Sequence, residues 1–181
     1  EGGTIILGNG YKNAQFLFQD NIFVNNRSSE YGSVFNLSKN GTLDLRRNIF
    51  SNNYTTNSDS SKGSLIHCTP VVANYSGQLI NPANTLFTEN GDTNTFNTLI
   101  TGKFSGSQNA FINNYSESLL RLPSGSTETI AMDNNYWGTK LANVIDSQIY
   151  DFYDDPAFNT PIASYSPFLL APPEVLAGSP S

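Results

Sequence analysis

A six-residue pattern recurs along this chain and limits its possible folds more than any other feature. Asn21–Asn26 (NIFVNN) returns almost unchanged as Asn48–Asn53 (NIFSNN), and looser copies follow. Each copy holds one aromatic residue, at spacings of about 27, 37, 24 and 26 residues: Phe23, Phe50, Phe87, Phe111 and Trp137. A unit that recurs every 20–50 residues, roughly, is typical of a solenoid.

A second apolar segment recurs beside each copy and alternates as a strand does. Gly2–Leu7, Gly32–Leu37 and Gly63–Cys68 align without gaps. Alternation places one set of side chains on an inner face: Ile5, Phe35, Ile66, Ile100 and Leu120, with Leu7, Leu37, Cys68 and Leu122 beside them. The opposite face carries the polar residues Thr4, Asn36, His67 and Arg121. A period of two with one polar face predicts a half-buried strand.

A third apolar pair precedes each Asn-X-Phe. The pairs are Phe16 with Phe18, Leu43 with Leu45 and Ile130 with Met132, and Leu79 and Phe104 are weaker equivalents. Three short strands per repeat, stacked repeat on repeat, predict an all-β right-handed parallel β-helix of about five coils over residues 1–137. The aromatic residues should then form one buried column, and Asn26, Asn53, Asn90 and Asn114 should form a hydrogen-bonded asparagine ladder.

The pattern changes after Trp137. Helical spacing of apolar residues predicts a short amphipathic helix from Lys140 to about Asp154, and Ile162–Tyr165 predicts one last strand. We expect residues 138–170 to cap the open end of the solenoid and residues 171–181, rich in proline, to form a linker or tail. The 37-residue step around Thr69–Ala83 contains Pro70, Gly77 and Pro82 and predicts a longer loop.

Composition restricts the partners of the chain. The formal net charge is −6 and the pI is about 4.5, which argues against nucleic acid and against an anionic membrane surface. No apolar run approaches the length of a membrane span. A single cysteine, Cys68, allows neither an internal disulfide nor a cysteine-based zinc cluster. Because Glu1 is not an initiator methionine and the repeat starts at once, we expect a processed product or an excised piece of a longer protein.

Two sets of residues carry a family resemblance. Phe-X-X-Asn followed by Gly-Ser-hydrophobic appears at Phe23–Asn26 with Gly32–Val34, and at Phe50–Asn53 with Gly63–Leu65. This pattern resembles the repeat of polymorphic outer membrane proteins. The ending NNYWG, IYDxxDD and YxPFL, which reaches Leu169, resembles the C-terminal turn of β-helix ectodomains in large surface proteins. The resemblance covers about residues 1–170 and implies an extracellular right-handed β-helix with structural or adhesive duty and no catalytic residues.

The candidate catalytic and metal-binding groups are few. Asp151, Asp154 and Asp155 form the one dense acidic cluster, which is interpreted as a helix end rather than a calcium site or a carboxylate pair. His67 falls on the outer face without an orienting partner in the pattern. Cys68 points inward as an inert core thiol. Arg121 is a candidate for binding a carboxylate, but a solvated outward arginine is the favoured interpretation. Outward Thr4, Thr98 and Thr101 form no regular rank, which disfavours ice binding. No catalytic residue, metal or cofactor is predicted.

Six Asn-X-Ser/Thr sequons occur, at Asn26, Asn36, Asn40, Asn53, Asn74 and Asn114. Asn26, Asn53 and Asn114 belong to the predicted inward ladder and would be poor glycan acceptors. Asn36 is predicted to point outward, and Asn40 and Asn74 fall in glycine-containing bends. If the protein is secreted from a eukaryote, we therefore expect glycans first at Asn36, Asn40 and Asn74.

These observations favour a non-enzymatic, extracellular or cell-surface structural or adhesive module of a larger protein or filament. Its expected partners are further coils or domains of the same protein, copies of itself, and possible glycans. The alternative is a polysaccharide-binding or polysaccharide-processing β-helix, lyase-like or hydrolase-like, whose groove lies partly outside this chain. The sequence does not identify the organism, the ligand or the oligomeric state.

Overall fold

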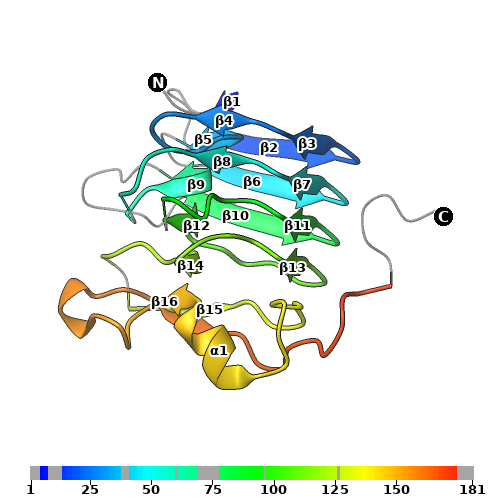
Figure 1. The fold of residues 1–181 in the computed structure, drawn as a ribbon. Coiled ribbons are helices and arrows are strands. Elements are labelled where there is room, and N and C mark those ends of the chain that lie inside the picture. Colours follow the sequence, from blue (N-terminus) through cyan, green and yellow to red (C-terminus); the bar gives the residue numbers. More distant parts are fainter. Residues whose placement is uncertain are drawn as a thin grey trace.

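The protein is all-β, with parallel sheets and one short α-helix among the residues that the structure describes (Figure 1). The computed structural model describes residues 5–7, 14–37, 41–59, 61–68, 78–95, 97–125 and 127–174. The predicted glycosylation sites Asn40 and Asn74 and the predicted tail beyond residue 174 lie outside these ranges.

Three larger sheets contain most of the described strands. The six-stranded sheet has the order β1 (Ile5–Leu7), β5 (Phe35–Leu37), β9 (Gly63–Cys68), β12 (Thr98–Thr101), β14 (Ser118–Arg121) and β16 (Ile149–Tyr150). The three-stranded sheet contains β2 (Ala14–Gln19), β6 (Gly41–Arg46) and β10 (Gln78–Ala83). The four-stranded sheet contains β3 (Ile22–Val24), β7 (Ile49–Ser51), β11 (Leu86–Thr88) and β13 (Ala110–Ile112).

Two further pairs complete the described strands, β4 (Arg27–Ser28) with β8 (Tyr54–Thr55) and β15 (Thr129–Ala131) with β17 (Ile162–Ser164). The chain passes through the sheets in turn, so strands that are neighbours in space lie about one repeat apart in sequence. Phe23 pairs with Phe50, and Phe50 pairs in turn with Phe87. We call the strands contributed by one repeat a layer.

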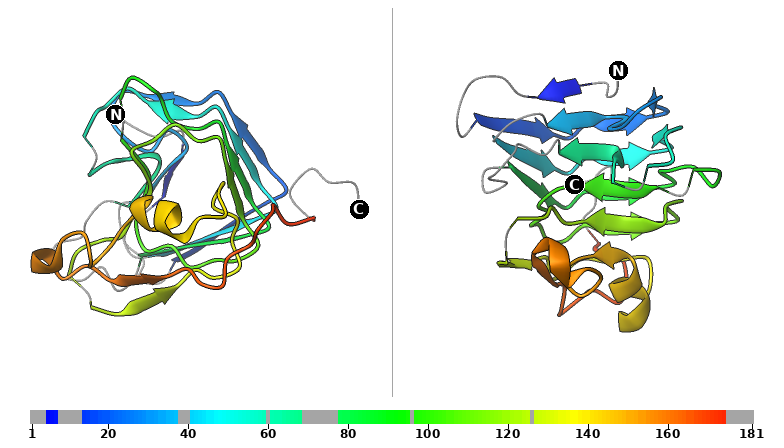
Figure 2. Two further views of the ribbon diagram at one scale, coloured as in Figure 1. Left: turned by 60° about the horizontal axis from the view of Figure 1, so that its bottom comes forward. Right: turned by 90° about the vertical axis from the view of Figure 1, so that its left-hand side faces the viewer.

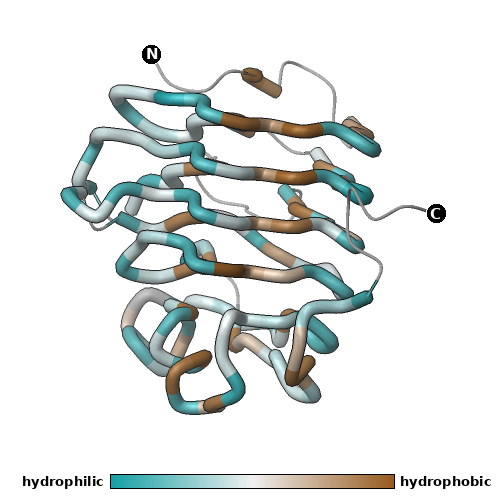
Figure 3. The backbone as a smooth tube through the Cα atoms, turned by 45° about the vertical axis from the view of Figure 1, so that its right-hand side comes forward, coloured by the Kyte–Doolittle hydropathy of each residue, from teal (hydrophilic) through white to brown (hydrophobic). Residues whose placement is uncertain are grey.

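Left-handed bends connect the sheets at the same place in successive layers. One set of bends follows the three-stranded sheet and its continuation: Asp20, Arg47, Asn84, Gln108 and Asn134, with φ between 51° and 60°. The other set follows the four-stranded sheet: Asn25, Asn52, Glu89 and Asn113, with φ between 50° and 58°. Asparagine and aspartate tolerate this conformation better than other residues with a side chain, which explains why the repeat is rich in asparagine. Figure 3 shows the bends as hydrophilic and the strands between them as more hydrophobic.

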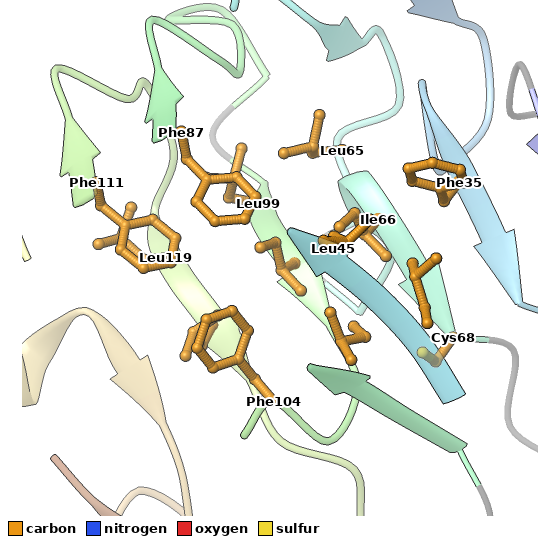
Figure 4. Close-up of a cluster of buried hydrophobic side chains, with 14 of the residues drawn as sticks. Phe35, Leu45, Leu65, Ile66, Cys68, Phe87, Leu99, Phe104, Phe111 and Leu119 are labelled. Carbon is orange, nitrogen blue, oxygen red and sulfur yellow. The ribbon is translucent and has the colours of Figure 1, made fainter. Parts of the chain in front are cut away.

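The core holds the aromatic column that the spacing predicts. The rings stack in order, with centroids 4.8 Å apart for Phe23–Phe50, 5.1 Å for Phe50–Phe87, 4.8 Å for Phe87–Phe111 and 5.0 Å for Phe111–Trp137. Aliphatic side chains from the other sheets pack against this column, as Figure 4 shows for Leu99 and Leu119. In the end-on view of Figure 2 the layers lie over one another.

The predicted asparagine ladder is also present. The Nδ2 atoms of Asn26, Asn53 and Asn90 each donate to the Oδ1 atom of the next ladder asparagine, at 2.7, 3.0 and 3.1 Å. Asn53, Asn90 and Asn114 also donate to backbone carbonyls of the preceding layer. Each bend is thereby tied to the layers above and below it.

A second polar column, which the sequence interpretation missed, runs along the other set of bends. Asn21 donates to Asn48 Oδ1 at 3.1 Å, and Asn109 donates to Asn135 Oδ1 at 2.9 Å. Thr85 lies between these pairs. Its hydroxyl accepts a hydrogen bond from the backbone N–H of Asn48, and its own backbone N–H donates to Asn109 Oδ1. A threonine therefore takes the place of one asparagine without breaking the column.

Three predictions of local structure need correction. Ile80, not Leu79, points into the core of the third layer, and the predicted loop around Thr69–Ala83 already contains β10 from Gln78 onward. The helix α1 spans only Ala142–Ser147. Ile149 and Phe152 lie beyond it because Ile149 pairs with Leu120 and extends the six-stranded sheet. The 138–170 segment does hold both a helix and a strand, together with the short 3₁₀ helix η2 (Pro156–Phe158).

Candidate functional site

One row of side chains lies in register across the outer face of the six-stranded sheet. Backbone pairing aligns Asn36 with His67, His67 with Thr101, Thr101 with Arg121, and Arg121 with Tyr150. We call these five residues the outer row. The sequence pattern placed Asn36, His67 and Arg121 on this face correctly, because strand alternation fixes the side to which a residue points.

The outer row is not uniformly solvated, which corrects the expectation for two of its members. Asn36 is 7% exposed and His67 is 2% exposed. The ring of Tyr31 lies over His67 with centroids 4.6 Å apart. Tyr31, from the connection between β4 and β5, therefore covers His67, and Asn36 is buried where the sequence pattern predicted an exposed side chain. This burial disfavours a glycan at Asn36, whose glycosylation stays a prediction.

A pocket of about 270 Å³ opens where the outer row passes His67, Thr101, Arg121 and Tyr150. Its other walls come from the turn before β9, from the segment that follows Arg121, and from the C-terminal region through Thr160. We call it the outer-face pocket. It brings together elements that are distant in sequence, so no local sequence motif predicts it.

Among the described residues, two cations and no carboxylate line the outer-face pocket, although the Asp59 carboxylate lies just outside the lining and accepts from the Ser61 hydroxyl at 2.6 Å. The Arg121 guanidinium carbon lies 3.8 Å from the centroid of the Tyr150 ring, and Lys62 Nζ lies 5.5 Å from that of Tyr31. Neither cation forms an ion pair with any carboxylate within the described ranges. In a chain with a net charge of −6, this arrangement is a local concentration of positive charge.

His67 is held as a neutral imidazole. Its Nδ1 atom accepts from the backbone amide of Gly63 at 3.2 Å and lies 2.7 Å from the Thr101 hydroxyl. An N–H aimed at Nδ1 favours the tautomer with the proton on Nε2, so the Thr101 hydroxyl donates as well. Burial, and then the charge of Lys62, lowers the pKa of His67 to about 4, against a smaller opposing effect of the Asp59 carboxylate. His67 is therefore a weak base near pH 7 and serves better as a hydrogen-bond donor through Nε2.

Hydroxyl groups supply the remaining polar lining. Ser61, Thr101, Ser124 and Thr160 line the pocket. Thr160 is 2% exposed, and its Oγ1 atom has no hydrogen-bond partner. A buried hydroxyl without a partner carries a desolvation cost that a bound ligand could remove. The sequence interpretation missed Thr160, Lys62 and Tyr150. The repeat pattern does predict that Thr101 shares the outer face with Arg121, because Thr101 follows the inward residue Ile100 as Arg121 follows the inward residue Leu120.

Cys68 is 4% exposed and faces the core, as predicted. Burial raises the pKa of its thiol to about 12. The thiolate needed for nucleophilic chemistry or for metal binding is therefore strongly disfavoured at neutral pH.

The acidic cluster of the C-terminal segment serves the backbone. The Asp151 carboxylate accepts from the amides of Tyr153 and Ala163 at 2.9 and 2.8 Å. Asp154 accepts from the amide of Asp151, and Asp155 caps η2 by accepting from Ala157. Asp151 is 7% exposed, so it is not the solvated residue that the sequence suggested. Within the described ranges no group of three or more potential ligands is placed to hold a metal ion.

In comparisons with known proteins, no protein-family model, curated protein or solved structure matches the chain. None of the helices in the described ranges combines the length and the apolar character needed to cross a lipid bilayer.

Proposed function

We propose that the chain is a right-handed parallel β-helix that serves as a non-enzymatic structural or adhesive module on the cell surface, within a larger protein or filament. Contacts at its N-terminal end would join it to a preceding coil of the same protein or to another copy. The observation that carries this proposal is the contrast between the two ends of the stack.

The stacking itself supports the β-helix. Parallel strands recur one layer later in each of the three larger sheets, and both polar columns and the aromatic column continue from layer to layer. Connections between parallel strands of one sheet are right-handed in nearly all proteins, which favours a right-handed coil.

Among the described residues, none pairs with the outer strand edges at the N-terminal end. β1, β2 and β3 are the terminal strands of the three larger sheets. β2 (AQFLFQ) and β3 (IFV) contain no charged residue and no proline, although such residues commonly protect an exposed strand edge. The core residues Phe16, Phe18 and Phe23 are only partly buried there, whereas Phe50 and Phe87 are fully buried.

The C-terminal end is covered. Ile145 of α1 and Ile149 of β16 are buried in the core cluster, and Tyr165 and Phe168 pack against it. β17 pairs with β15, and β16 pairs with β14. Growth of the stack is therefore favoured at one end only.

Sedimentation and turnover assays on the same preparation test this proposal. We expect association that increases with protein concentration and weakens in Leu17→Lys and Ile22→Lys variants, whose side chains are 58% and 67% exposed. Tyr153→Lys, at a residue 73% exposed near the other end, is the matched control. We also expect native protein at the cell surface, by protease treatment of intact cells, and no new reducing ends from pectin or alginate.

Turnover of either polysaccharide would overturn the non-enzymatic assignment and favour the polysaccharide-processing alternative. Equal association of the Leu17→Lys, Ile22→Lys and Tyr153→Lys variants would overturn the assignment of the contact to the N-terminal edge.

A further inference from the structure

We propose that the outer-face pocket binds a hexuronate, the carboxylate-bearing sugar unit of an acidic polysaccharide. The inference is independent of end-to-end stacking, because the pocket lies on the side of the layers and not at their N-terminal edge.

The charged residues of the pocket favour an anionic ligand. Lys62 and Arg121 line the pocket, and the described residues contribute no aspartate or glutamate to the lining. Asp59 lies outside the lining, and its pKa is lowered by its hydrogen bonds from Ser61 and also by the charges of Lys62 and Arg121. Two cations against one nearby carboxylate leave an excess of positive charge at the pocket. The adjoining hollow on the other side of Arg121 differs, because Glu117 and Asp154 contribute to its lining. Arg121 therefore contributes to both hollows, and only the outer-face pocket combines it with Lys62 in a lining without a described carboxylate.

The geometry of Arg121 favours a carboxylate. Its guanidinium carbon lies 3.8 Å from the centroid of the Tyr150 ring, and this contact with the ring face is not a hydrogen bond to the N–H groups. No acceptor for these groups is present among the residues that the structure describes. A carboxylate can take two parallel hydrogen bonds from a guanidinium, and bonds between charged groups are about twice as strong as neutral ones.

The remaining donors and acceptors match sugar hydroxyls. Thr160 Oγ1 is buried without a partner, and His67 carries its proton on Nε2. Ser61 and Ser124 belong to the lining, and the Ser61 hydroxyl, which already donates to Asp59 Oδ1 at 2.6 Å, can only accept from a ligand. Leu122 and Pro123 add an apolar wall suited to the C–H face of a pyranose ring. A simple anion such as acetate would satisfy the cations but would leave these groups unused.

The size of the pocket restricts the ligand further. A volume of about 270 Å³ falls just below the range of roughly 300–1,000 Å³ that is usual for drug-sized ligands. The pocket therefore suits one sugar unit. A chain of such units would have to extend along the surface on either side of it.

Titrations of the ¹⁵N-labelled protein with small glycosides, followed by NMR, test the inference. The probes are methyl galacturonide, its methyl ester, methyl galactoside and acetate. We expect methyl galacturonide to shift the amide signals of Thr101, Arg121 and Thr160, and to bind at least about tenfold more tightly than the ester, the galactoside or acetate.

Three variants localise the binding. Arg121→Gln should weaken binding of methyl galacturonide by about tenfold, because it removes the paired donors and their charge. Thr160→Val should weaken it by about fivefold, because it removes one hydrogen bond to the ligand. Thr160→Val loses no bond within the protein, so it should remain as stable as the unaltered chain. Arg47→Gln, at an exposed arginine paired with Asp20, should leave binding unchanged.

Several outcomes would overturn the inference. If the neutral galactoside binds as tightly as the uronide, the site is not selective for an anion. If acetate binds as tightly, the site is a simple anion site. If a folded Arg121→Gln variant binds as well as the unaltered chain, the pocket is not the site. None of these outcomes bears on the association test, since neither Arg121 nor Thr160 lies at the N-terminal edge.

Discussion

An asparagine side chain carries one acceptor and two donors, and this combination suits a bend that repeats in stacked layers. Asn53 Oδ1 accepts from both the backbone and the side chain of Asn26, and its Nδ2 donates to Asn90 and to a backbone carbonyl. Asn53 and Asn90 are 0% exposed, so these bonds replace those that water would supply. This ladder was predictable because each of its asparagines follows the aromatic residue of its repeat by three positions. The second column was missed because Thr85 replaces an asparagine in it.

The titration of the single residue His67 should make the stability of the folded protein depend on pH. The pKa of His67 is about 4 in the folded protein, against an ordinary value of 6.5. The folded state therefore binds fewer protons than the unfolded state between these values. Stability falls as the pH drops from 6.5 to 4, with no further loss from this group below 4. The total loss is about 3 kcal/mol.

Urea unfolding at several pH values measures this loss. The unaltered chain should lose more stability than a His67→Gln variant between pH 6.5 and 4, since the carboxylates titrate alike in both. Parallel pH profiles of the two proteins would contradict the assignment.

At the scale of elements, the short strands depend on the left-handed bends between them. Four bends follow the strands of the four-stranded sheet, and three of them use asparagine while the fourth uses Glu89, with φ 54°. A glutamate in this conformation is strained, because its Cβ approaches the following carbonyl and its longer side chain lacks the local hydrogen bond that asparagine makes.

Replacing Glu89 with asparagine should therefore stabilise the protein by about 0.5–1 kcal/mol, by relief of this strain. Glu89 is exposed, so the substitution disturbs no packing. Thermal unfolding measures the gain. The matched control is Glu117→Asn, at an exposed bend with ordinary φ, where no gain is expected. A loss of stability in Glu89→Asn would show that the bend is not strained.

At the scale of the whole molecule, the position of a layer in the stack decides how much each aromatic ring contributes. Phe87 is 0% exposed between Phe50 and Phe111, whereas Phe23 has a stacked neighbour in the column on one side only, Phe50, and is partly exposed. Identical side chains at equivalent positions of the repeat should therefore contribute different amounts to the free energy of unfolding.

Phe87→Ala should lower the free energy of unfolding by about 3–5 kcal/mol, through lost burial and the cavity left behind. Phe23→Ala should cost about 1–2 kcal/mol less, because part of its ring already contacts solvent. Urea unfolding at low protein concentration compares the two variants with the unaltered chain. An equal loss would mean that the first layer is covered in solution.

The sequence by itself determined the period, the inner and outer faces of the strands, the aromatic column and the asparagine ladder. These follow from spacing along the chain, because each layer repeats the same short-range pattern. The burial of Asn36 and His67, the short extent of α1 and the outer-face pocket were decided only by the tertiary structure. Tyr31 covers His67, and Thr160 completes the pocket beside Arg121, from parts of the chain outside the repeat pattern. Such contacts depend on the paths of connections whose lengths vary between repeats, so no periodicity encodes them.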